Sequence, residues 1–165
     1  MAYDVTIKRQ GLSALFDLKG VADQVAAWTG PHLPKLPTTP NSCAATDDSA
    51  LYCIGLDHWL VRAPIAQEDS LCAALKPENC PPDISIVRVS DTLVFFEITG
   101  PDAGEVMAVA CPLDLHPSVF GVDKVTYTEA FGLKALVRRV EGGFEFAVEQ
   151  SFGNMVTDYL ARTTA

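Results

Sequence analysis

The chain has 165 residues, a length that predicts a single domain over residues 1–165, because domains commonly run to about 100–200 residues. Hydrophobic residues make up 48% of the chain and charged residues 20%, a mixture that excludes a disordered protein. Its 12 basic and 21 acidic residues give a net charge of −9, which argues against nucleic acid or an anionic membrane as the main partner.

The first ten residues do not have the pattern of an export signal. They contain Asp4, Lys8 and Arg9 and lack the apolar run of about 7–15 residues that such a signal needs. No stretch of the sequence approaches the roughly 20 apolar residues that span a bilayer. We therefore expect a soluble, cytoplasmic chain.

A strand, a helix and a proline-rich connector are predicted next. Residues 11–18 are typical of a strand, and apolar residues recur at helical spacing over residues 20–29. Residues 32–42 are rich in proline, which removes backbone donors and fixes φ. This stretch is therefore predicted to be an extended connector on the surface of the domain.

The middle of the chain is predicted to contain two strand pairs that flank one helix. Proline ends this helix because it cannot continue the ladder of backbone hydrogen bonds. The segments are a hairpin of residues 50–55 and 59–63, a helix over residues 66–76 ended by Pro77, and strands 83–89 and 92–98 with Ser90-Asp91 as the turn.

The next predicted helix starts at Gly100-Pro101-Asp102 and runs to about residue 110. Proline suits the first helical position, where its missing N–H would have no partner, and an aspartate favours the positive end of the helix dipole. Three strands should follow, with 125–130 paired to 133–140 and 144–149 entered through a tight Gly142-Gly143 turn. Apolar and polar residues alternate in this last strand, which predicts one buried and one exposed face.

The final element is predicted to be an amphipathic helix with Ser151 as its N-cap. Its apolar stripe consists of Phe152, Met155, Val156, Tyr159 and Leu160. Strand pairs separated by single helices, without strict alternation, predict an α+β fold with largely antiparallel strands and four short helices.

A search for chemistry finds no self-contained active site in the sequence. Glycine-rich phosphate loops, paired-cysteine and H-E-x-x-H metal motifs and the G-x-S-x-G elbow are all missing. Cys111, Asp114 and His116 offer three ligand types in six residues, but their spacing favours local turn contacts. Cys111 also follows the C-terminal end of a predicted helix, where the dipole disfavours a thiolate.

The other residues that often carry chemistry are interpreted as structural. The five cysteines are predicted to be free and mostly buried, because their number is odd and the expected compartment is reducing. Trp28 and Trp59 fit apolar patterns and are predicted to lie in the core. The acidic pairs are predicted to lie on solvated faces: Asp47-Asp48, Glu68-Asp69 and Glu145 with Glu149.

A family resemblance is carried by one short segment and by the start of the last helix. The segment Cys111, Pro112, Leu113, Asp114, Leu115, His116 and Pro117 resembles the C-x-L-D-L-H-P signature of the γ subunit of heterotetrameric sarcosine oxidase. Ser151 and Phe152 are similar to the S-F pair of the same family. We interpret both as structural turns or as contacts with a partner. Further similar positions run in register from about residue 11 to 162: Pro40-Asn41-Ser42, residues 55–60, Asp91, residues 99–103, Phe120, Thr128 and Tyr159-Leu160.

The resemblance implies the fold of the folate-binding domain of aminomethyltransferase-type proteins. It also implies an accessory, non-catalytic chain without a catalytic, cofactor or metal site of its own. The implied partners are α, β and δ subunits that carry FAD, FMN, NAD, tetrahydrofolate and zinc. Such a complex oxidatively demethylates sarcosine or a related N-methyl amino acid and passes the one-carbon unit to tetrahydrofolate.

Three positions depart from the pattern of this family. Leu56, His58 and Gln150 stand where the family has proline, glutamate and arginine. Without this arginine, any ion pair that it makes in the family is in doubt, so the substrate of the complex could differ. Two alternatives stay open, a stand-alone folate-binding or one-carbon transfer module and a non-enzymatic scaffold. In the subunit interpretation, the acidic surface becomes a feature for docking to a partner.

Overall fold

The chain forms two compact units, each with one five-stranded sheet. The structure is a computed structural model that describes residues 3–46, 49–76 and 78–165, so the predicted helix stop at Pro77 and the Asp47-Asp48 pair lie outside the described residues. Unit 1 combines the residues up to Gly11 with Thr92–Ala165, and unit 2 consists of Leu12–Asp91. The expectation of a single domain stays a prediction, and the units are described separately.

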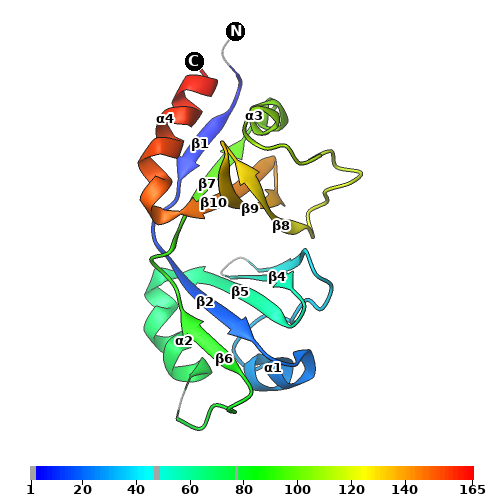
Figure 1. Cartoon of the computed structure of the whole chain (residues 1–165), viewed down its shortest axis with the longest axis vertical. Helices are drawn as coiled ribbons and strands as arrows, with labels where there is room; N and C mark the ends of the chain where they lie inside the picture. The colour runs from blue at the N-terminus through cyan, green and yellow to red at the C-terminus, as the bar shows by residue number, and fades with distance from the viewer. Residues whose placement is uncertain (1–2, 47–48, 77) are drawn as a thin grey trace. The chain divides into compact units, whose positions relative to one another are not determined.

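Unit 1 is an antiparallel sheet in the order β1-β7-β10-β9-β8 with two α-helices (Figure 1). Its strands are β1 (Thr6–Arg9), β7 (Leu93–Thr99), β8 (Val125–Ala130), β9 (Leu133–Val140) and β10 (Gly143–Glu149). Its helices are α3 (Ala103–Ala110) and α4 (Gly153–Thr163), with the 3-10 turn η2 (Gln150–Phe152) leading into α4.

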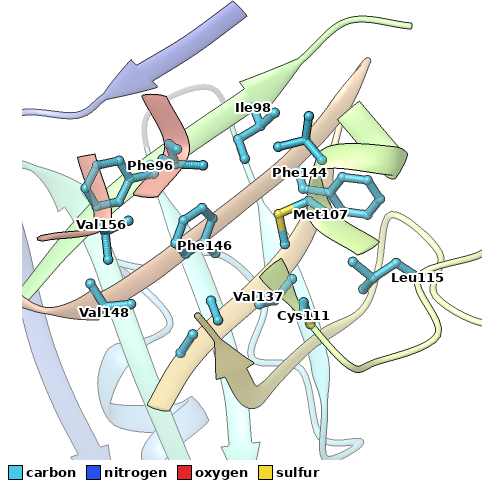
Figure 2. Close-up of a cluster of buried hydrophobic side chains, with 14 of the residues drawn as sticks. Phe96, Ile98, Met107, Cys111, Leu115, Val137, Phe144, Phe146, Val148 and Val156 are labelled. Atoms are coloured by element: carbon cyan, nitrogen blue, oxygen red, sulfur yellow. The ribbon is translucent and has the colours of Figure 1, made fainter. Parts of the chain in front are cut away.

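The core of unit 1 lies on the sheet face that α3 and α4 cover. Phe96 of β7 and Phe146 of β10 stack at the centre, with ring centroids 5.4 Å apart. Figure 2 shows Met107 of α3 and Val156 of α4 among the side chains of this cluster. These contacts explain why the two helices form at positions where the sequence is apolar at helical spacing.

Two adjacent glycines at the turn into β10 serve different purposes. Gly142 has φ +72°, a left-handed conformation, and a Cβ there would meet nothing within 4 Å. A Cβ at Gly143 would lie 2.0 Å from the carbonyl oxygen of Ile98 on β7. Gly142 is thus needed for its backbone conformation, whereas Gly143 is needed for the close approach of two strands.

We expect alanine to be far more damaging at Gly143 than at Gly142. Gly143→Ala forces the β7 and β10 backbones apart and should cost about 3 kcal/mol. Gly142→Ala adds only left-handed strain, about 1 kcal/mol. Thermal unfolding followed by circular dichroism measures both variants. Equal losses of stability would contradict the assignment of a steric role to Gly143.

Unit 2 is an antiparallel sheet in the order β3-β4-β5-β2-β6. Its strands are β2 (Ser13–Lys19), β3 (Ser42–Ala45), β4 (Ala50–Gly55), β5 (His58–Pro64) and β6 (Ser85–Arg88). Its helices are α1 (Ala22–Thr29) and α2 (Glu68–Leu75), which follows the 3-10 turn η1 (Ile65–Gln67).

The proline-rich connector closes the core of unit 2. As predicted, it contains no helix or central strand, but the expectation that it lies on the surface is wrong in part, because Leu33 and Leu36 are buried in the cluster. Trp59, which is 1% exposed, donates its indole N–H to the carbonyl of Pro37 at 2.6 Å. Trp28 donates to the carbonyl of Leu75 at 2.8 Å, but it is only partly buried and packs against the cluster, so the core prediction is confirmed for Trp59 and in part for Trp28.

The α+β class is confirmed, since every strand pair of the described residues is antiparallel and four α-helices are present. A turn lies at Ser90-Asp91, as predicted, but it joins no hairpin, because β6 pairs with β2 in one sheet and β7 pairs with β1 and β10 in the other. The hydroxyl oxygen of Ser90 instead accepts a hydrogen bond from the backbone N–H of Leu15. The end of β6 is thereby tied to β2.

Three local predictions in unit 1 also need correction. The helix α3 begins at Ala103, so Pro101 precedes the cap residue Asp102 instead of taking the first helical position, and the Asp102 carboxylate accepts the backbone N–H of Asp4. Ser151 does not cap α4, because its hydroxyl donates to the Glu149 carboxylate at 2.8 Å. Strand β10 has no exposed face between its ends, since Gly143 through Val148 are all buried in this central strand.

Candidate functional site

Unit 1 contains a cavity of about 490 Å³ beside the start of α3. It is bounded by the residues that lead into α3, by the segment that follows α3 and by the ends of β9 and β10. The lining residues are Gly100, Pro101, Ala103, Gly104, Ala108, Leu113, Asp114, Leu115, His116, Pro117, Arg139, Gly142, Gly143 and Phe144. Five consecutive residues of the C-x-L-D-L-H-P motif therefore line the cavity.

The motif forms an irregular segment after α3, ending in a turn, and its Cys111 and Leu115 side chains anchor it in the core. Cys111 is 4% exposed and donates its backbone N–H to Met107 at 2.8 Å, which ends α3. Leu115 is buried in the same hydrophobic cluster (Figure 2). The Asp114 carboxylate accepts the backbone N–H of His116 at 2.9 Å, a local turn contact of the kind that aspartate favours. His116 Nδ1 lies 2.7 Å from the hydroxyl of Ser118.

Arg139 of β9 holds this segment in place through hydrogen bonds to its backbone. Its Nε donates to the carbonyl of Phe120 at 2.7 Å, and its Nη2 donates to the carbonyl of Leu115. The guanidinium carbon lies 4.6 Å from the centroid of the Phe144 ring, the cross-strand neighbour on β10. Sequence reasoning missed Arg139, because one arginine in an alternating strand carries no signal of a long-range contact.

Ser151 and Phe152 do not line this cavity. Both lie in η2, at the entrance to α4, and the Phe152 side chain is partly exposed. The sequence motif thus divides into two places on unit 1, a turn beside α3 and a turn before α4.

The polar groups of the motif do not form a metal or nucleophile constellation. Among the described residues, no group of three or more His, Cys, Asp or Glu side chains is placed to hold a metal ion. Cys111 does not line the cavity, although the nearby Asp114 and His116 do. The interpretation of the two polar residues as turn-stabilising fits the hydrogen bonds that they make.

The five cysteines are free in the structure. Cys53 and Cys111 are buried, and Cys43, Cys72 and Cys80 are partly buried. Burial raises the pKa of the Cys53 thiol above its usual value, which keeps this group protonated and unreactive. In the part of the chain that the structure describes, no helix is long and apolar enough to span a membrane.

The fold of the chain is shared with a known class of proteins. A glycine cleavage system aminomethyltransferase T from Bartonella henselae matches with a TM-score of 0.74 over 96% of this chain and 46% of that chain. The sequence identity is 13%, so this likeness shows the fold alone. The chain therefore has the α+β fold seen in aminomethyltransferase-type proteins, as the sequence resemblance implies.

The chain belongs to the sarcosine oxidase, gamma subunit family, whose model matches residues 23–165. A sarcosine oxidase subunit gamma from Arthrobacter sp. is 31% identical over 117 residues. That match covers 70% of this chain and 55% of the relative, so it spans little more than half of the relative's length. The structure of heterotetrameric sarcosine oxidase from Corynebacterium sp. U-96 in complex with pyrrole 2-carboxylate gives a TM-score of 0.81 at 26% identity, over 97% of this chain and 83% of that chain.

Proposed function

We propose that the chain is the accessory, non-catalytic γ-type subunit of a flavin-dependent, sarcosine oxidase-like complex. The complex would oxidatively demethylate sarcosine or a related N-methyl amino acid and pass the one-carbon unit to tetrahydrofolate. The observation that carries the proposal is the match to a chain of a heterotetrameric sarcosine oxidase over 97% of this chain. A cytoplasmic location is part of the proposal.

The geometry of the cavity supports an accessory role. Each polar side chain of the motif that lines it makes a structural contact: Asp114 with the backbone of His116, and His116 with Ser118. Arg139 is engaged by two backbone carbonyls and an aromatic ring. These groups hold the turn in place, whereas a catalytic site presents such groups to a substrate.

We assign the cofactors of the complex to partner chains, as α, β and δ subunits that carry FAD, FMN, NAD, tetrahydrofolate and zinc. No metal-ligand cluster is formed among the described residues, and the sequence has no glycine-rich loop between a strand and a helix that would hold a dinucleotide.

The test is purification of the tagged chain from its own organism. We expect larger flavin-bearing chains to co-purify with it, and the chain produced alone to lack flavin absorbance. Mass spectrometry identifies the partners, and turnover of sarcosine and of other N-methyl amino acids by the purified complex identifies the substrate. An active, flavin-bound preparation of this chain alone would contradict the proposal, and so would micromolar binding of tetrahydrofolate to the isolated chain.

A further inference from the structure

The two units have the same order of elements, so equivalent positions in them can be compared. Unit 2 runs β2-α1-β3-β4-β5-η1-α2, and unit 1 runs β7-α3-β8-β9-β10-η2-α4. The sheets correspond as well, with the order β3-β4-β5-β2 in one and β8-β9-β10-β7 in the other. Trp59 and Phe144 are therefore equivalent, because each is the second residue of its strand, β5 or β10, and each lies in the core of its unit.

In unit 2 the chain itself covers this aromatic residue. The indole N–H of Trp59 donates to the carbonyl of Pro37, which belongs to the connector after α1. Leu33 and Leu36 of the same connector are buried in the hydrophobic cluster that contains Trp59. The covering segment is thus an irregular, proline-rich stretch that contributes leucine side chains.

In unit 1 the equivalent aromatic residue borders the cavity. Phe144 lines it together with Leu113 and Leu115 of the connector after α3, so the leucines of this connector leave a volume of about 490 Å³ unfilled (Figure 2). Pro101 and Ala108 also line the cavity and are exposed, so it opens to solvent. Its volume falls in the size range of binding pockets.

The lining of this cavity has no excess of charge of either sign. Its titratable side chains are Asp114, His116 and Arg139. Each of the three already binds a backbone or hydroxyl group of the segment that follows α3. The other lining residues are glycine, alanine, leucine, proline and phenylalanine. The cavity therefore offers an occupant mainly apolar contacts, and exposed apolar surface with polar residues around it is typical of an interaction site.

We infer that this cavity is the docking site for an uncharged segment of another chain of the complex, which inserts a leucine-type side chain beside Phe144. The inference rests on the proposed function, because it takes the occupant from a partner subunit. Two observations select this occupant: the lining is apolar with balanced charge, and leucines cover the equivalent position of unit 2. A second copy of the chain is a poorer occupant, because a net charge of −9 opposes self-association.

The first test measures reassociation of the purified complex. Partner chains that co-purify with the tagged subunit are separated from it, immobilised and rebound with wild-type or variant subunit. Gly104→Leu adds a side chain at the cavity wall, where a Cβ would meet nothing within 4 Å, and Ala108→Glu adds a charge to an exposed part of the wall. We expect about tenfold weaker binding for each variant. Binding of the wild type should change less than about threefold between about 0.05 M and about 0.5 M salt, because apolar contacts are not screened.

Matched controls make the same two changes away from the cavity. Ala161→Leu and Ala161→Glu alter an exposed position of α4, and both should bind within about twofold of the wild type. Cavity variants that bind as the wild type does would overturn this inference alone, and so would wild-type binding that weakens tenfold in high salt. A wild-type subunit that binds no flavin-bearing chain would overturn the proposed function and the inference together.

The second test identifies the occupant by hydrogen exchange of the partner chains. One partner segment should be protected when the wild-type subunit binds and should lose that protection, at equal occupancy, when Ala108→Glu replaces the wild type. We expect this segment to contain leucine and to lack charged residues. A charged segment, or protection that is the same with both subunits, would contradict the assignment of an apolar occupant.

Discussion

Replacement of Arg138 by alanine should lower the free energy of unfolding by about 3–5 kcal/mol, because it removes the guanidinium that neutralises a buried carboxylate. Arg138 Nε donates to Glu145 Oε1 at 2.8 Å, and the two residues face each other across β9 and β10. Their side chains are 19% and 4% exposed. A carboxylate this poorly solvated is costly once its guanidinium is gone.

The size of the loss should depend on what replaces the pair. Glu145→Gln keeps an oxygen that accepts the hydrogen bond, and Arg138→Met/Glu145→Leu removes both charges, so each should cost less than half as much as Arg138→Ala. Thermal unfolding followed by circular dichroism measures these losses of stability. In a chain of this size, each kcal/mol lowers the Tm by about 2–4 °C. An Arg138→Ala variant as stable as the double variant would show that the carboxylate finds water or another partner.

The local pattern of the sequence predicted the long elements of the fold correctly. Helices α1, α2, α3 and α4 lie where apolar residues recur at helical spacing, and the β4–β5 and β8–β9 pairs lie where strands were expected. Two short strands were missed. β1, with the sequence Thr-Ile-Lys-Arg, is a charged edge strand, and charge on an edge protects against unwanted pairing but hides the strand from pattern reasoning.

Strand partners were predicted less well than strands, for a physical reason. Alternation says that a segment is a strand but not which segment it pairs with. The gap between β6 and β7 has the length of a hairpin turn, yet Ser90-Asp91 lacks the glycine that tight hairpin turns favour. The hydrogen bonds of Val89 and Ser90 to Leu15 show that this short link ends one sheet before the other begins.

The candidate site was predicted only in part. The motif that resembles the family, Cys111 to Pro117, was located from sequence, and the structure places five of its residues on one cavity. The contribution of β9 and of the turn into β10 to this cavity was not predicted. Arg139 and Gly142 reach it through the pairing of β9 with β10, and nothing in their local sequence distinguishes them from ordinary strand and turn residues.

The second large effect is expected at the aromatic stack of unit 1. Phe146 is fully buried, and its ring centroid lies 5.4 Å from that of Phe96. Phe146→Ala removes these ring contacts and leaves a cavity, so it should lower the free energy of unfolding by about 3–5 kcal/mol. Phe146→Leu keeps most of the apolar volume and should cost about 1–2 kcal/mol.

The comparison residue is Phe152, which is 37% exposed, and its alanine variant should lose less than about 1 kcal/mol. Urea unfolding of the three variants measures the differences. A Phe152→Ala loss as large as that of Phe146→Ala would make the S-F turn a part of the folding core, whereas the small loss expected here leaves Phe152 free to serve as a contact for a partner.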